Sequence, residues 1–440
     1  MRNRLNLSQI FRLLLVGLLA LIALTTSIPS IAQESPPEIR IARLVKQLGS
    51  EVYAERKQAD EELAALGFES RRQLELATQS TNAEIRLRAT DLLKRIKLKE
   101  IWLPGQAQLN LKNEKASKAL SSLMEQTGNH ILRGDSYGAF HDADVSVQVE
   151  KAGYWATLDD LCRQSGNHIR PNFDVREPGL VVVAGPPGKN PVAYAGPLRA
   201  QVTSARRVFI EELDHDDQKS DVTHTFQINF QMMWEDRLQL VAYRSQPDIV
   251  EAITDTKVSL TPVQSSNTSW NVAGSGTRQL TANLRLSPPP AQAKQLDKLV
   301  LKWGLVAVGD FAAIDVTDLN SKENHCQDDV QLVVEEFEER SSGRYDVTVL
   351  VTRDLAVPDP QDIVFQENRF ELFDDKGHSL RSQGQSNVLT DRGARQKLTF
   401  TSETGQEKPK VLRLTYPRLR SQQEMELTFR NVPLPSARPE

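Results

Sequence analysis

Polar and apolar residues alternate along several segments in the C-terminal half of the chain. The clearest alternating runs are Phe226 to Trp234, Leu280 to Leu286, Tyr345 to Val351 and Leu412 to Tyr416. A period of two is typical of strands that bury one face. Turn-forming residues such as Ser341-Ser342-Gly343 separate the runs. The pattern predicts antiparallel β-sandwiches over residues 206–434.

This strand-rich region also repeats itself. Ile249–Asp255 resembles Arg369–Asp375, and both segments lead to a Ser-Leu pair, Ser259-Leu260 and Ser379-Leu380. Near the end of each half, Lys298–Leu301 resembles Lys410–Leu414, and Ala313–Val316 then parallels Leu427–Arg430. We therefore predict two tandem antiparallel β-sandwich domains, residues 206–320 and 330–434, with a boundary near Ser321–Asp329.

A second duplication lies between Leu109 and Ala184. Thr127-Gly128-Asn129-His130-Ile131 recurs 38 residues later as Ser165-Gly166-Asn167-His168-Ile169. Each copy has a short alternating strand, then a helical stripe such as Ala116, Ala119, Leu120 and Leu123. Gly128 and Gly166 stand where a left-handed residue would end each helix. The order predicts a β-α-β/β-α-β domain over residues 108–185, with two helices on one face of a small sheet.

The strand, the helix with its Leu spacing and the Thr-Gly or Ser-Gly turn, written twice, resemble the short N-terminal domain of secretins and TonB-dependent receptors. The resemblance covers residues Leu109 to Ala184. Domains of this family act as periplasmic docking or signalling modules without catalytic residues. The resemblance therefore implies a docking role and transfers no functional residue to this chain.

The N-terminal part predicts export and a helical segment. Residues 1–32 resemble a signal peptide, with Arg2 and Arg4 before the apolar run Leu13–Leu24 and a small-residue cleavage site at Ser30-Ile31-Ala32. An uncleaved N-terminal anchor is the alternative. In residues 38–98, Arg56, Ala59 and Leu63 recur 30 residues later as Arg86, Ala89 and Leu93. This repeat resembles a HEAT-type helix pair, and residues 186–205 are predicted to be a linker before the sandwiches.

The charge and the cysteine content of the chain limit the kinds of binding partner and of covalent cross-link that we expect. The formal net charge is −4 and no long basic run occurs, so nucleic acid binding has little support. No integral membrane domain is expected beyond the signal segment. Cys162 and Cys326 are the only cysteines. Cys162 lies on a helical apolar stripe, where free Cys behaves as a small hydrophobe, although an oxidising compartment would permit a bridge between the two.

Several short motifs invite a chemical interpretation, and each has a structural alternative that we favour. His130 and His168 are too few for zinc and are expected to shape turns. Glu211–Asp217 lacks the spacing of a calcium loop and is expected to be solvated. Gly185–Lys189 does not fit the phosphate-loop spacing. His141–Asp144 is predicted to be a turn, and His325-Cys326 with Asp328 and Asp329 does not make a nucleophile with an activating base.

These observations predict a multi-domain α+β protein: a short HEAT-like helical segment, a small β-α-β/β-α-β domain and two tandem antiparallel β-sandwich domains. We predict a non-enzymatic secreted or periplasmic envelope protein that docks a protein partner. No catalytic, cofactor-binding or metal-binding residue is assigned, no cofactor is expected, and the oligomeric state is not specified. The alternatives are a carbohydrate- or polymer-binding protein, with Trp234, Trp270 and Trp303 as candidate aromatic contacts, and a secreted hydrolase. A sheltered hollow gathering ionisable groups from separate modules would overturn the account.

Overall fold

The computed structural model describes residues 37–436 except 135–137, 173–178, 187, 214–219, 264–268, 274–277, 342, 354–368, 391–392 and 403–407. The predicted signal segment lies outside this range. A few helices accompany many strands, which form several mostly antiparallel sheets, so the mixed α and β class is confirmed. The chain divides into two compact units, the first ending at Ile96 and the second beginning at Lys97.

The first unit consists of paired helices around one apolar cluster. Its elements are α2 (Pro37–Gln47), α3 (Tyr53–Leu66), the 3-10 helix η1 (Gly67–Ser70), α4 (Arg71–Ala77) and most of α5 (Ala83–Glu100). Leu48, Ala59, Leu63 and Leu74 are completely buried in its core. The helices expected from the sequence are therefore present, and they bury one apolar core within residues 37–96.

The repeat in the helical unit extends to hydrogen bonds. Arg56, the fourth residue of α3, donates from Nη1 to the Ser50 carbonyl at 2.7 Å. Arg86, the fourth residue of α5, donates in the same way to the Ser80 carbonyl at 2.6 Å. Each guanidinium thus holds the turn before its own helix, and the two hydrogen bonds recur with the 30-residue spacing of the sequence repeat.

The central duplication is reproduced element by element. The first copy contains β1 (Gln106–Lys115), α6 (Ala116–Thr127) and β2 (Ile131–Arg133), and the second contains β3 (Asp144–Gly153), α7 (Tyr154–Ser165) and β4 (Asn167–Asn172). The strand β5 (Gly179–Ala184) follows. Gly128 and Gly166 end the two helices at φ +70° and +68°. The predicted helix-ending role of both glycines is confirmed, and only glycine adopts this conformation cheaply.

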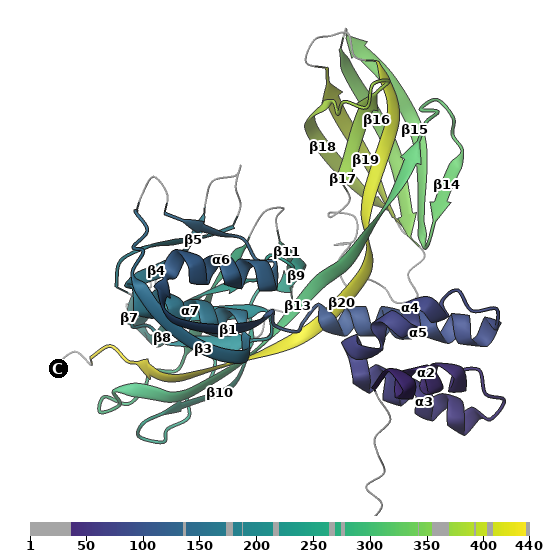
Figure 1. Cartoon of the computed structure of the whole chain (residues 1–440). Coiled ribbons are helices and arrows are strands. Elements are labelled where there is room, and N and C mark those ends of the chain that lie inside the picture. The colour runs from purple at the N-terminus through teal and green to yellow at the C-terminus, as the bar shows by residue number, and fades with distance from the viewer. Residues whose placement is uncertain are drawn as a thin grey trace, which may run out of the picture. The chain divides into compact units, whose positions relative to one another are not determined.

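The single sheet predicted for this domain is wrong. β1 pairs with β3 in a two-stranded antiparallel sheet, while β2, β5 and β4 form a separate three-stranded sheet. One apolar cluster joins both sheets to α6 and α7. In Figure 1 the two helices lie between the sheets. In α7 the buried side chains, which include Tyr154, Trp155, Leu158 and Leu161, extend over a wide arc of the helix surface, so this helix can contact both sheets.

Three further sheets surround two apolar cores, which we call the first and the second sandwich. A four-stranded sheet contains β6 (Val192–Ala195), β7 (Leu198–Leu213), β8 (Ser220–Trp234) and β12 (Gln279–Leu286). A six-stranded sheet contains β9 (Gln239–Arg244), β10 (Asp248–Thr254), β11 (Trp270–Val272), β13 (Gln295–Val316), β17 (Arg369–Asp374) and β20 (Pro409–Pro433). A five-stranded sheet contains β14 (Asn324–Gln327), β15 (Val330–Ser341), β16 (Arg344–Arg353), β18 (Arg381–Thr390) and β19 (Gly393–Thr401).

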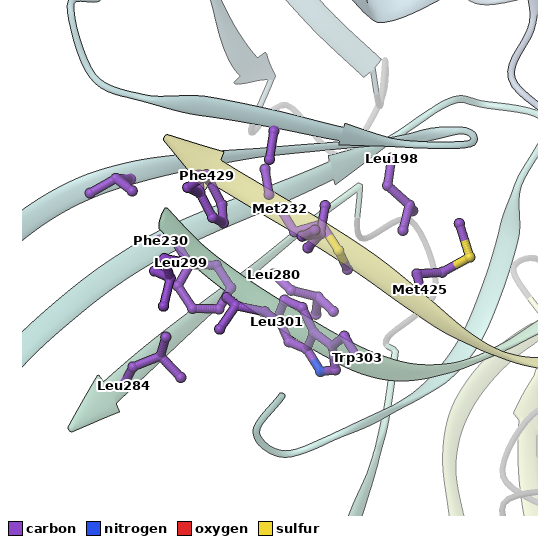
Figure 2. Close-up of a cluster of buried hydrophobic side chains, with 14 of the residues drawn as sticks. Leu198, Phe230, Met232, Leu280, Leu284, Leu299, Leu301, Trp303, Met425 and Phe429 are labelled. Carbon is purple, nitrogen blue, oxygen red and sulfur yellow. The ribbon is translucent and has the colours of Figure 1, made fainter. Parts of the chain in front are cut away.

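The two sandwiches are not separate tandem segments. β13 and β20 pair antiparallel from Leu296 opposite Val432 to Val316 opposite Leu412. Met425 and Phe429 of β20 pack in the first core beside Phe230 and Trp303, as Figure 2 shows. Conversely, the end of β13 packs in the second core with the start of β20. The end of β20, which belongs to the predicted domain 330–434, therefore packs in the first sandwich. The end of β13, which belongs to the predicted domain 206–320, packs in the second.

The duplication within the sandwiches is visible in two hairpins 120 residues apart. After β10, the Thr254 amide donates to the Val258 carbonyl at 3.0 Å. After β17, the Asp374 amide donates to the His378 carbonyl at the same distance. β10 then pairs with the start of β13, and β17 with the start of β20. Each half therefore has a hairpin followed by a long strand, β13 in the first half and β20 in the second. The far end of each long strand packs in the sandwich of the other half (Figure 1).

The predicted linker 186–205 is also wrong in part. β6 and the first half of β7 lie inside it, and β7 pairs with β8 from Leu198 opposite Trp234 onward. The first sandwich begins near Val192 and not at residue 206. Pro and Gly residues before Val192 drew the prediction toward a linker, although Leu198, Ala200 and Val202 keep the alternation of a strand and are buried.

Candidate ligand-binding hollow

The helix α7 and the β6–β7 hairpin enclose a hollow of about 410 Å³. His168 and Ile169 of β4, with Pro186 and Gly188 after β5, complete its wall. We call this site the α7–β6 hollow. Its polar lining comes from two modules, because Asp159, Asp160 and Arg163 belong to the duplicated domain while Tyr194 and Arg199 belong to the first sandwich.

A buried ion pair crosses the hollow. Arg199, whose side chain is 6% exposed, donates to both carboxylate oxygens of Asp159 at 2.8 and 3.0 Å. The Tyr194 hydroxyl donates to the same carboxylate at 2.6 Å. Arg199 also donates to the Gln201 side-chain oxygen at 3.1 Å. This network ties α7 to two neighbouring strands and fixes the orientation of the Tyr194 ring.

Burial raises the pKa of two neutral groups in the wall. It raises the pKa of the Cys162 thiol to about 12, with the negative charge of Asp159 acting in the same direction. Burial and the charge of Asp159 also raise the pKa of the Tyr194 hydroxyl well above its usual value. Both groups are therefore protonated at neutral pH, and Cys162 is not a thiolate nucleophile there.

A second ion pair lies at the rim. Arg163 pairs with Asp160, which also accepts a hydrogen bond from Gln164 Nε2 at 2.9 Å. Both carboxylates of the hollow are thus bound to guanidinium groups, so neither is free to act as a general base in this arrangement. The chemistry available is hydrogen bonding to a ligand beside one exposed aromatic ring.

The two modules that line the hollow are joined by contacts near Glu235, which follows β8. The Glu235 carboxylate accepts hydrogen bonds from the Gly105 amide at 2.9 Å and from Arg237 Nε at 2.9 Å. The Asn129 side chain accepts a bond from the Asp236 amide at 2.8 Å, and the Trp155 indole donates to the Pro197 carbonyl at 2.9 Å. The duplicated domain is therefore fastened to the first sandwich through backbone and side chain.

The two Asn-His motifs have different surroundings. The backbone amide of His130 donates to the Asp236 carboxylate at 2.6 Å, so the first motif belongs to this contact between modules. In the second motif, the Asn167 amide group exchanges hydrogen bonds with the backbone of His141 at 3.0 and 2.8 Å. His168 lines the hollow, and its buried Nδ1 has no hydrogen-bond partner among the residues that the structure describes. The structure does not bring His130 and His168 together as metal ligands.

Other sequence candidates have structural positions. Asp142 accepts hydrogen bonds from the Ser117 amide and hydroxyl at 2.8 and 2.9 Å at the start of α6, as a turn residue would. His325 and Cys326 are neighbours on β14, so their side chains point to opposite faces and make no catalytic pair. Asp328 accepts from the Tyr416 hydroxyl at 3.1 Å, and Asp329 pairs with Arg353 at 2.6 Å. The acidic run Glu211–Asp217 lies outside the described residues apart from the backbone of its first three members.

The aromatic residues proposed for carbohydrate contact are poorly placed. Trp234 and Trp303 are 1% and 0% exposed within the first core. Trp270 is half-buried, with the Arg244 guanidinium 5.9 Å from its ring centre. Cys162 and Cys326 are both free, the first buried and the second exposed, so the bridge between them is not formed. Gly185 and Gly188, rejected above as a phosphate loop, lie beside the hollow, where Gly188 faces the Gln201 amide.

Cys162, His168 and Gly188 of the lining were discussed from the sequence for other reasons, but the polar network of Asp159, Tyr194 and Arg199 was not singled out. Tyr194 and Arg199 fell in the predicted linker, and Asp159 is one of two adjacent carboxylates on a polar helix face. The alternation across Leu198, Ala200 and Val202 was the available signal, because it places Arg199 and Gln201 together on the opposite face of a strand. Ionisable groups from two modules do meet in this hollow, but each of its two carboxylates pairs with an arginine, so the hollow supplies no unpaired carboxylate among the described residues of its lining.

Within the described ranges, no helix is both long and apolar enough to span a membrane. No three His, Cys, Asp or Glu side chains gather as a metal site would require among the same residues. No protein-family model, curated protein or solved structure matches the chain, so its function has to be argued from the molecule itself.

Proposed function

We propose that the chain is a non-enzymatic secreted or periplasmic envelope protein that acts as an interaction or scaffolding module. The observation that carries this proposal is the distribution of exposed apolar side chains. Among the described residues, six of the thirteen exposed large hydrophobics lie on the short helical unit: Ile39, Val52, Tyr53, Phe68, Leu76 and Leu87. Concentrated exposed apolar surface is typical of protein-binding sites.

The rest of the chain supports the same proposal. In the helical unit, Arg56 and Arg86 stabilise turns, and the repeat resembles HEAT-type pairs that present a helical surface. The duplicated domain, which resembles the secretin and TonB-receptor docking module, is fastened to the first sandwich through Glu235 and Asp236. The apolar run before residue 37 supports export. The sandwiches would then act as a spacer joined by the β13–β20 ribbon.

The test uses photo-crosslinking amino acids placed at single positions in the cells that make the protein. Crosslinkers at Phe68 and Leu87, which are 71% and 69% exposed, are expected to capture one shared partner. A crosslinker at Lys57, whose side chain is 62% exposed in the same unit, is the matched control for accessibility. Products that contain only the chain itself, or equal capture at Lys57, would contradict the proposal.

A second candidate function rests on the α7–β6 hollow. Its fixed polar network and exposed ring favour the binding of a small ligand, which supports the carbohydrate- or polymer-binding alternative over the hydrolase. The hydrolase alternative lacks a comparable observation, because Asp159 and Asp160 are each bound by an arginine.

A further inference from the structure

One aromatic ring in the α7–β6 hollow is both fixed and exposed. Tyr194 lies on β6, the edge strand of its sheet, and remains 45% exposed although its hydroxyl is held by Asp159 at 2.6 Å. The hydrogen bond limits rotation of the ring, so a ligand that packs on it loses little side-chain freedom in the protein. Aromatic rings in this situation provide a flat apolar surface with a polar edge.

The charges of the hollow favour an uncharged ligand. Asp159 is neutralised by Arg199, and Asp160 by Arg163. An anion would have to compete with Asp159 for a guanidinium that is almost completely buried, and a cation would have to compete with Arg199 for the carboxylate. Breaking a buried pair leaves an uncompensated charge, which is strongly unfavourable. Neither a phosphate nor an amine therefore fits the inner wall well, and at the more exposed rim the charges of Arg163 and Asp160 offset each other.

Hydrogen-bonding groups remain available beside the ring. The Gln201 side-chain oxygen is bound by Arg199, but among the described residues its amide nitrogen donates to no other group. The His168 ring also lines the hollow and adds a second planar polar side chain to its wall. Planar polar side chains held in place beside a flat apolar face match a ring that has hydroxyls at its edge and C–H groups on its face.

We propose that the α7–β6 hollow binds a neutral, polyhydroxylated ring, that is, an uncharged sugar unit. The ring packs on Tyr194, and its hydroxyls bond to Gln201 and to the outer faces of the Asp159–Arg199 pair. The volume of about 410 Å³ accommodates one or two sugar units and leaves the rest of an oligosaccharide in solvent. This binding does not depend on partner docking by the helical unit.

The test is calorimetric titration of the chain from Gln33 onward with N,N′-diacetylchitobiose, cellobiose and mannobiose, which are all uncharged. Glucuronic acid, glucose 6-phosphate and Gly-Gly serve as charged comparisons. At least one neutral disaccharide is expected to bind. Tyr194→Ala is expected to weaken that binding about tenfold by removing the ring, and Tyr194→Phe only about threefold because the ring remains. Phe209→Ala, at a 55% exposed aromatic elsewhere on β7, is the matched control and should leave affinity unchanged.

Because Tyr194→Ala removes a hydrogen bond that holds β6, a second variant tests sugar binding without altering that strand. Ala156 is exposed on α7 and lines the hollow, so Ala156→Trp fills the space without removing any hydrogen bond. It is expected to abolish sugar binding while the melting temperature stays near that of the parent. The proposal is overturned if no neutral disaccharide binds at about 10 mM, if the charged compounds bind in preference, or if Ala156→Trp leaves affinity unchanged.

Discussion

Glu235 is the residue on which the contact between the duplicated domain and the first sandwich depends most. Its side chain is completely buried and accepts hydrogen bonds from Gly105, Asn129 and Arg237. Glu235→Ala would leave the buried amide and the guanidinium without their acceptor. We expect a loss of about 3 kcal/mol in unfolding free energy, measured by urea denaturation monitored through the five tryptophans.

Glu335→Ala is the control for the Glu235 variant. Glu335 also accepts from an arginine, Arg395, but the pair lies at the surface, with side chains 27% and 51% exposed. Removing it should cost less than about 1 kcal/mol. Similar losses for the two variants would show that Glu235 contributes only as a surface group does.

The two thiols should react very differently. Burial in α7 raises the pKa of Cys162 to about 12, whereas Cys326 is exposed on β14. At pH 8 iodoacetamide should therefore modify one thiol per native chain and two in denaturant, and Cys326→Ser should leave none reactive in the native chain. Mass spectrometry of tryptic peptides identifies the site. Rapid native modification of Cys162 would contradict its burial.

The ion pair between Asp315 and Arg413 predicts a pH effect. Hydrogen bonds at 2.7 Å from Arg413 lower the pKa of Asp315 below its ordinary value of 3.8. The stabilisation is therefore complete above that value and is lost as pH falls through the lower folded pKa. Because both side chains are 42% exposed, Asp315→Asn should cost only about 0.5 kcal/mol at pH 7.

Melting temperatures at neutral and strongly acidic pH check this effect. The difference between the parent and Asp315→Asn should shrink toward zero in acid, where the parent carboxylate is protonated as well. In an Arg413→Gln background the substitution should cost nothing at either pH. A difference that is independent of pH, or that persists without Arg413, would exclude the ion pair as its source.

At the scale of elements, local repeats were predictable and long-range pairing was not. Gly128 and Gly166, with the apolar stripes before them, define the ends of α6 and α7 because helix spacing and left-handed caps are local properties. The sequence does not show whether strands from two copies share one sheet, since β1–β3 and β2–β5–β4 pairing depends on residues far apart. The prediction of one sheet failed for that reason, and Arg199 was missed because its partner Asp159 lies 40 residues away.

The exchange of β13 and β20 between the sandwiches has a related cause. Lys298–Leu301 and Lys410–Leu414 resemble each other because they open equivalent long strands, and the resemblance alone suggested two independent domains. The strands continue past their own core, with register shifts on both sides of Asp310, which lies opposite Leu419. Such a bulge lets a strand bend from one core toward another. The length of β13 and β20, and not the residue composition of the two halves, therefore causes the two sandwiches to share strands.

At the scale of the whole molecule, this exchange predicts which fragments fold. A chain of residues 33–320 ends at the sequence-predicted boundary but lacks Met425, Leu427, Phe429 and Val432, which are all buried in the first core. We expect it to be insoluble or to show no cooperative unfolding, because an apolar face and one edge of β13 would be exposed. Replacing residues 309–419 by Asn-Gly should instead restore the core, since Val308 lies opposite Arg420 and Asn-Gly favours two-residue hairpins.

Circular dichroism and thermal unfolding of the two fragments give the comparison, with the tryptophan environment as a second readout. Both fragments keep Trp234 and Trp303, so their emission reports the same core in each. Phe429→Ala in the joined fragment should lower its unfolding free energy by about 3–5 kcal/mol, because it removes a fully buried ring. If residues 33–320 alone fold cooperatively with buried tryptophans, β20 is dispensable for the first sandwich and the exchanged architecture does not hold in solution.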